Sequence, residues 1–168
     1  MTEHELLNRI AGQDEVALRQ LYGLYYPRLA RFAFRLTQDI QIVGEVINDV
    51  FFVVWQKAGG FRGDSSPSTW IMGIAYKKVL KAYKRQQSLR LVELPEDFAG
   101  EPASDPAPDV FSLVHRLSLK HQAVIILTYQ FGYSYKEISE IVACPENTVK
   151  SRMHHARKAL QTLLETDS

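Results

Sequence analysis

The sequence is poor in several features that would point to particular classes of protein. It contains one cysteine among 168 residues, which excludes a disulfide within the chain and is typical of a reducing compartment. No apolar run is long enough for a transmembrane helix, and no charged and then apolar leader follows Met1. A cytoplasmic protein without stable membrane insertion is therefore expected. The formal net charge is only +1, so any affinity for nucleic acid must come from cations gathered in patches.

The sequence also lacks the residue groupings that enzymes and metal sites need. Its acidic residues show no pairing suited to general acid and base catalysis. Cys144, His154 and His155 are the nearest approach to a zinc site, but a fourth ligand is missing and Cys144 falls in a tight turn. We therefore expect a protein that is not an enzyme and that has no metal site and no cofactor.

Two short helices joined by a tight turn are predicted near the C-terminus. Ser134 and Glu137 form a capping box, so a helix should begin at about Tyr135. A proline in the following turn ends this helix, and a second one should begin at Asn147 or Thr148. This is the pattern of a helix-turn-helix unit, whose second helix enters the major groove of DNA.

The second of these helices has an apolar back and a basic front. The apolar stripe consists of Val149, Met153, Ala156 and Leu160. Candidates for reading bases are Lys150, Ser151, His154 and His155, and candidates for holding phosphates are Arg152, Arg157 and Lys158. An ordinary amphipathic helix with a solvated basic face is the alternative.

Apolar residues elsewhere follow helical spacing, which predicts an all-α protein. Helices are expected within residues 3–26, with a break and cap at Gly12 and Asp14, and from Arg28 to about Thr37, with Pro27 just before the first turn. The other expected helices are Asp39 to Lys57, Trp70 to Gln87, Val110 to Leu117 and Lys120 to Phe131, with a loop from Gly59 to Thr69. The predicted C-terminal core contains Val124, Leu127, Phe131, Ile138, Val142, Val149 and Met153.

The segment from Asp39 to Lys57 carries two stripes. One is a broad valine-rich face suited to a core, and the other consists of Glu45, Asn48, Asp49, Phe52 and Gln56. An acidic stripe with a large apolar residue in it suggests a protein partner. Periodicity alone slightly favours the alternative, a fully enclosed helix with Phe52 buried.

The glycine-rich loop and the helix after it combine an aromatic ring with many cations. Phe61 and Arg62 could hold an unstacked base, although a loop aromatic more commonly lies in a core. Between Trp70 and Arg90 there is no acidic residue, which is typical of a phosphate-binding surface. The cations of this helix are Lys77, Lys78, Lys81, Lys84 and Arg85.

The segment from Leu91 to Asp109 differs from the rest, with four prolines, six acidic residues and no lysine or arginine. We interpret it as an extended, mobile linker between a domain of residues 1–90 and a domain of residues 110–168. A simple spacer is one interpretation. The other is an acidic segment that mimics nucleic acid and weakens DNA binding by the free protein.

Two stretches carry a resemblance to a known family. They are FRGDSSPSTWIMGIA, residues 61–75, and SYKEISEIVACPENTVKSRMHHARKAL, residues 134–160. With them, nearly the whole chain resembles the extracytoplasmic-function (ECF) sigma factors, which are two-domain initiation factors of bacterial RNA polymerase.

The resemblance implies a role for each surface. The residues matching the grip on the clamp helices of the largest subunit of core RNA polymerase are Glu45, Asn48, Asp49 and Phe52. The residues at the positions with which the family captures and melts the minus-ten element are Phe61, Arg62, Asp64, Ser65, Thr69, Trp70, Lys77, Lys78, Lys81, Lys84 and Arg85. Those matching the reader of the minus-thirty-five element are Thr148, Lys150, Ser151, Arg152, His154, His155, Arg157 and Lys158. The implied partners are core RNA polymerase, promoter DNA as duplex and as melted single strand, and an anti-sigma factor.

The chain also departs from the family pattern. Lys77 and Lys81 stand where the family usually has Asn and Asp, which leaves the minus-ten base preference open. The function expected from the resemblance is that of an alternative sigma factor that directs polymerase to specific promoters and assists their opening. The alternatives are a sigma-fold DNA-binding regulator, or a sigma mimic, that does not form open complexes.

Overall fold

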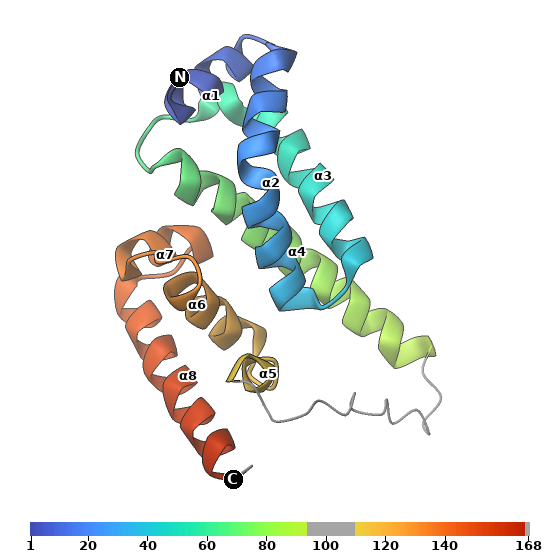
Figure 1. Cartoon of the computed structure of the whole chain (residues 1–168), viewed down its shortest axis with the longest axis vertical. Coiled ribbons are helices and arrows are strands. Elements are labelled where there is room, and N and C mark those ends of the chain that lie inside the picture. Colours follow the sequence, from blue (N-terminus) through green and yellow to red (C-terminus); the bar gives the residue numbers. More distant parts are fainter. Residues whose placement is uncertain (94–109, 167–168) are drawn as a thin grey trace.

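The computed structural model describes residues 1–93 and 110–166, and the described residues form helices and no strand. The all-α class is therefore confirmed. The elements are α1 (Glu3–Ala11), α2 (Glu15–Thr37), α3 (Ile40–Lys57), the short 3-10 helix η1 (Ala58–Gly60), α4 (Pro67–Glu93), α5 (Val110–Val114), α6 (Leu119–Tyr129), α7 (Tyr135–Val142) and α8 (Glu146–Thr166). Figure 1 shows α1–α4 in one half of the molecule and α5–α8 in the other.

The N-terminal half is built from the long helices α2, α3 and α4, which pack against one another, with α1 across one end (Figure 1). Buried apolar side chains of all four helices, such as Ile10, Phe32, Val50 and Ile71, form its core. Asp14 caps α2, since its carboxylate accepts hydrogen bonds from the backbone N–H groups of Val16 and Ala17.

The sequence had suggested that a new helix begins at Pro27. In the structure, Pro27 lies inside the continuous helix α2. Its ring removes the hydrogen bond to the carbonyl of Gly23. Both residues are exposed, so that carbonyl can bind water instead. Buried Tyr25 and Leu29 on the opposite side hold the helix against the core across this position.

Helix α4 is longer at both ends than the predicted segment. It begins at Pro67 because the Ser66 hydroxyl accepts a hydrogen bond from the backbone N–H of Thr69 at 3.2 Å. It continues to Glu93 and so includes the first residues of the predicted linker. The rest of that linker, residues 94–109, lies outside the described residues.

The predicted helix-turn-helix is present as α7 and α8. The capping box of Ser134 and Glu137 is formed, and α7 ends at Val142, followed by Ala143, which adopts a left-handed backbone conformation. Helix α8 begins at Glu146, slightly earlier than predicted, because the carbonyl of Pro145 accepts hydrogen bonds from the next turn. Residues buried here and predicted for the core are Val124, Leu127, Ile138, Val142, Val149 and Met153.

Two helices near the start of this half are shorter than predicted. Helix α5 ends at Val114, and α6 ends at Tyr129, before Gly132 turns the chain with a φ of 71°. Phe131 therefore lies in the turn, half-buried, with its ring 6.1 Å from that of Phe32 in α2. It packs at the boundary between the two halves and not in the centre of the C-terminal core.

The two halves are in direct contact through α4 and α7, and through α2 and α6. Gly73 of α4 lies so close to α7 that a Cβ placed there would be 3.5 Å from the carbonyl oxygen of Ile141. A polar network crosses the same boundary, in which Arg28 donates to the Ser68 hydroxyl at 2.9 Å and both contact the Tyr133 hydroxyl. The buried apolar residues consequently form one continuous cluster across both halves.

Replacing Ser134 with alanine is expected to lower the free energy of unfolding by about 1 kcal/mol, because a helix loses its N-cap. The Ser134 hydroxyl accepts the backbone N–H of Glu137 at 3.1 Å, and both residues lie near the surface. Urea denaturation followed by circular dichroism measures the effect. Ser151→Ala is the matched control, since Ser151 is exposed within α8 and caps nothing. Equal stabilities of the two variants would contradict the role of the cap.

Candidate protein-binding and nucleic-acid interfaces

The predicted protein-binding stripe of α3 lies on the surface. Phe52 is 62% exposed, Asn48 and Asp49 are exposed, and Glu45 is half-buried. The alternative in which α3 is fully enclosed and Phe52 is buried is therefore wrong. A large apolar ring held in water costs free energy unless a partner covers it, so this surface is suited to protein binding.

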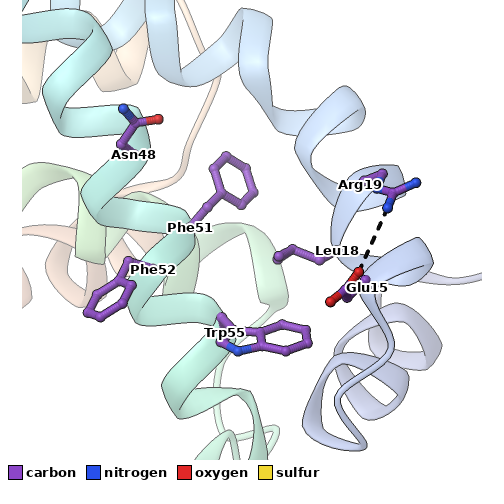
Figure 2. A pocket seen from close by; sticks show the side chains of 7 residues that line it. All are labelled: Glu15, Leu18, Arg19, Asn48, Phe51, Phe52 and Trp55. Carbon is purple, nitrogen blue, oxygen red and sulfur yellow. Dashed lines mark ion pairs between the residues drawn. The ribbon is translucent and has the colours of Figure 1, made fainter.

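A groove of about 470 Å³ continues this stripe toward α2 (Figure 2). Its walls carry Asn48, Phe51, Phe52 and Trp55 from α3, and Glu15, Leu18 and Arg19 from α2. Figure 2 shows Leu18 of α2 facing Phe51 and Trp55 of α3, whereas the Phe52 ring lies on the other side of the α3 ribbon. Trp55 lies at helical spacing from Phe52, so periodicity could have found it, whereas the contribution of α2 depends on tertiary packing.

Glu45 is linked to the basic helix. Arg85 of α4 donates a hydrogen bond to its carboxylate, and the two form an ion pair. This hydrogen bond lowers the pKa of Glu45 and raises that of Arg85. The sequence assigned these residues to different surfaces, but the structure brings them together.

The loop between η1 and α4 presents its predicted residues in different ways. Arg62 and Asp64 are exposed and Ser65 is half-buried. The Phe61 ring packs against Trp70 at 5.1 Å and against His4 at 5.9 Å, measured between ring centroids. The rings of Phe61 and Trp70 are therefore already held in position, so a DNA base could stack on either of them without first ordering it.

Thr69 is the least accessible of the predicted minus-ten residues. It is only 2% exposed, and its hydroxyl donates to the backbone carbonyl of Ser66 at 3.0 Å. In this arrangement Thr69 stabilises the start of α4, and the neighbouring Ser68 hydroxyl reaches Arg28 and Tyr133.

A cleft of about 320 Å³ lies between α3 and α4, and we call it the lysine cleft. It is lined by Val53 and Lys57 from α3 and by Trp70, Ile74, Lys77, Lys78 and Lys81 from α4. The sequence had identified the three α4 lysines. Lys57 was missed, because its place beside them follows only from how α3 crosses α4. Lys84 and Arg85 of α4 lie outside the cleft lining.

The front of α8 is open to solvent. The exposed members of the predicted set are Lys150, Ser151, His154, His155, Arg157 and Lys158, while Thr148 and Arg152 are half-buried. Arg157 donates to the Tyr129 hydroxyl at 3.0 Å, which fixes its guanidinium against α6. His155 lies 6.5 Å from His121 between ring centroids, and burial lowers the pKa of His121.

Comparison with known protein families matches both halves of the chain. Residues 21–89 match Sigma-70 region 2, and residues 110–160 match Sigma-70 region 4. The chain belongs to the sigma-70 family, in its ECF group. Members of this family are non-enzymatic initiation factors, and this ECF sigma factor directs transcription from specific promoters.

Curated relatives and solved structures agree with this assignment. The ECF RNA polymerase sigma factor SigL of Mycobacterium tuberculosis is 28% identical over 165 residues, covering 92% of this chain and 93% of the relative. The ECF RNA polymerase sigma factor SigK of Mycobacterium bovis is 26% identical over 172 residues, covering 95% of this chain and 92% of the relative. Among solved structures, RpoE with the anti-sigma factor NepR from Bartonella quintana has a TM-score of 0.68 at 26% identity, covering 89% of this sigma factor and 98% of RpoE.

The fold is also that of CnrH, solved in complex with the cytosolic domain of CnrY. The TM-score is 0.75 at 24% identity, and the match covers 99% of each chain. Within residues 1–93 and 110–166, this sigma factor contains no helix with the length and apolar character needed to span a membrane.

Proposed function

We propose that this ECF sigma factor binds core RNA polymerase with α3, opens the minus-ten element with α4 and its preceding loop, and anchors upstream DNA with α8. The observation that carries the proposal is where the two family matches fall. The match to region 2 covers the exposed stripe of α3 and the basic helix α4, and the match to region 4 covers the helix-turn-helix. In this division, residues 1–90 form the domain for polymerase and minus-ten binding, 91–109 the linker, and 110–168 the domain for minus-thirty-five binding.

Exposure and charge support α3 as the polymerase contact. Phe52 offers an apolar anchor that is 62% exposed, with Asp49 and Asn48 beside it on the same helical face. An acidic rim around an aromatic residue fits a partner with basic residues around an apolar pocket, and anchors of this kind carry most of the energy of an interface. The clamp helices of the largest polymerase subunit are the proposed partner.

A concentration of cations beside aromatic rings supports α4 and its loop as the minus-ten contact. Melted DNA exposes both phosphates and base faces, and it is held by cations and aromatic side chains together. The lysine cleft supplies the cations, and Trp70 is half-buried at its wall with Phe61 packed behind it. Arg62 and Asp64 are exposed in the preceding loop, where they can reach the displaced strand.

The helix-turn-helix supports upstream anchoring. The N-terminal residues of a recognition helix lie nearest to the base edges, and Lys150 and Ser151 occupy this position in α8 with exposed side chains. Lys158 and Arg157 lie further along the same front, where phosphates of the duplex would pass.

An anti-sigma factor is the proposed regulator. Support comes from the solved relatives, since RpoE was solved with the anti-sigma factor NepR and CnrH with the cytosolic domain of CnrY. A cytoplasmic location follows from the proposal, because the polymerase and its DNA template are there.

Transcription in vitro tests the proposed function. Core polymerase is incubated with a genomic DNA library, with and without the chain, and transcript starts are mapped. We expect new starts that share two spaced upstream motifs. No new starts, despite measurable DNA binding by the chain, would favour a regulator that keeps the fold and does not form open complexes.

A further inference from the structure

The lysine cleft carries an inference about which base this protein selects. We propose that the cleft reads a guanine in the minus-ten element through the ammonium groups of Lys77 and Lys81. The inference rests on the proposed function and adds the identity of one base to it.

The polar groups of the cleft are all hydrogen-bond donors. Its lining contains four lysines, and the remaining lining residues are the apolar Val53 and Ile74 and the indole of Trp70. A lysine ammonium donates and cannot accept, and an indole N–H only donates. Glu45, an acidic residue of α3, lies outside the lining; Arg85 donates a hydrogen bond to its carboxylate, and the charge of Lys81 also acts on it. A ligand of this cleft must therefore present acceptors.

The lysines are available for such a ligand. Lys57, Lys77 and Lys81 are exposed, and within the described part of the chain none of the four cleft lysines forms an ion pair. Lys77 and Lys81 are one helical turn apart on α4, so their ammonium groups can converge on a single flat group. Lys57 faces the cleft from the last turn of α3.

Among the four bases, guanine fits a set of donors best. Its major-groove edge carries two adjacent acceptors, O6 and N7, and lysine or arginine at this edge is the commonest specific contact to DNA. Adenine and cytosine present an amino group on the same edge, which would find no acceptor in the cleft. Thymine presents a single acceptor and a methyl group. We therefore expect the cleft to bind guanine with the highest affinity. Adenine and cytosine should bind more weakly, because their amino group would be left without a hydrogen-bond acceptor.

The apolar floor distinguishes this cleft from a simple phosphate site. Val53 and Ile74 are half-buried, and Trp70 is braced by Phe61, so a flat base can rest against the walls while its edge meets the ammonium groups. Lysines that only held phosphates would strengthen binding equally for every sequence. Base dependence is thus the property that separates the two.

The experiment uses the reconstituted holoenzyme and the promoter mapped by transcription. The minus-ten positions are randomised, open complexes are isolated, and their DNA is sequenced. At one position we expect guanine to be enriched over adenine by about tenfold. In the double variant Lys77→Met, Lys81→Met this enrichment should fall below about twofold. Methionine keeps a flexible apolar stem close to the length of the lysine stem, with sulfur in place of one methylene, and lacks the charged ammonium group with its donors.

Lys84→Met is the matched control, because Lys84 is an exposed lysine of the same helix outside the cleft lining. It should reduce the total yield of open complexes and leave the guanine enrichment unchanged. Absence of any guanine enrichment with the unaltered protein would overturn the proposal. So would an enrichment that survives in the double variant, or one that Lys84→Met reduces to the same extent.

A parallel assay without polymerase keeps this inference separate from the proposed function. The full chain is titrated with fluorescent oligothymidine strands that carry guanine, adenine, cytosine or thymine at one central position. Tighter binding to the guanine strand, lost in the double variant, would support the cleft even if no promoter is opened. Equal binding to all four strands would overturn it even if transcription succeeds.

Discussion

The double substitution Asp49→Arg, Phe52→Ala is expected to weaken binding to core RNA polymerase by at least about 100-fold. The alanine would remove the apolar contact area of Phe52. The arginine at position 49 would place a positive charge opposite a partner surface that is expected to be basic. Because both positions are exposed on α3, the core of the N-terminal half stays intact.

A pull-down with purified core polymerase over a range of protein concentrations measures this loss of affinity. Circular dichroism with thermal melting verifies the fold. Phe34→Ala is the control, since Phe34 is a 43% exposed aromatic residue of α2 outside the stripe and the groove. Unchanged polymerase binding by the double variant would exclude the α3 stripe as the contact. Equal losses in both proteins would point to a general effect of removing surface rings.

The second large effect is expected at α8. Replacing Lys150 and Arg152 with alanine should weaken binding to the minus-thirty-five duplex by about 10-fold to 100-fold. The dependence of affinity on salt should also become shallower, by about one to two units in the logarithmic slope, because fewer counterions are released from the phosphates.

Fluorescence anisotropy over a series of salt concentrations provides both quantities. Lys120→Ala serves as the comparison, since it removes an exposed lysine at the first turn of α6 and none from α8. If the salt slope is the same before and after the double substitution, these two residues do not contact the phosphates. The double variant loses two positive charges and Lys120→Ala loses one. A loss of binding free energy no larger than twice that of Lys120→Ala would therefore indicate only the effect of net charge.

Local signals in the sequence were sufficient for several helix boundaries in the described part of the chain, among them the starts of α2 and α7. The capping box at Ser134 and the cap at Asp14 depend on contacts within a few residues, so the sequence contains all the information they need. Pro27 misled the prediction, because its local preference for a first turn was weaker than the packing of Tyr25 and Leu29 around it.

Features built by distant segments could not be predicted in this way. The groove between α2 and α3, and the position of Lys57 beside the lysines of α4, depend on how long helices cross. The exposure of Phe52 was ambiguous for the same reason, since periodicity reveals two stripes without showing which faces the core. Family resemblance favoured the exposed alternative, and the structure agrees with it.

The ion pair between Glu45 and Arg85 has a consequence for genetic analysis. It connects a residue assigned to polymerase binding with one assigned to promoter binding. Substituting either residue leaves the other with an unpaired charge, so the phenotypes of single substitutions will not separate the two functions. Their effects should be epistatic, and a double-mutant cycle that combines the two substitutions isolates the interaction energy between the residues.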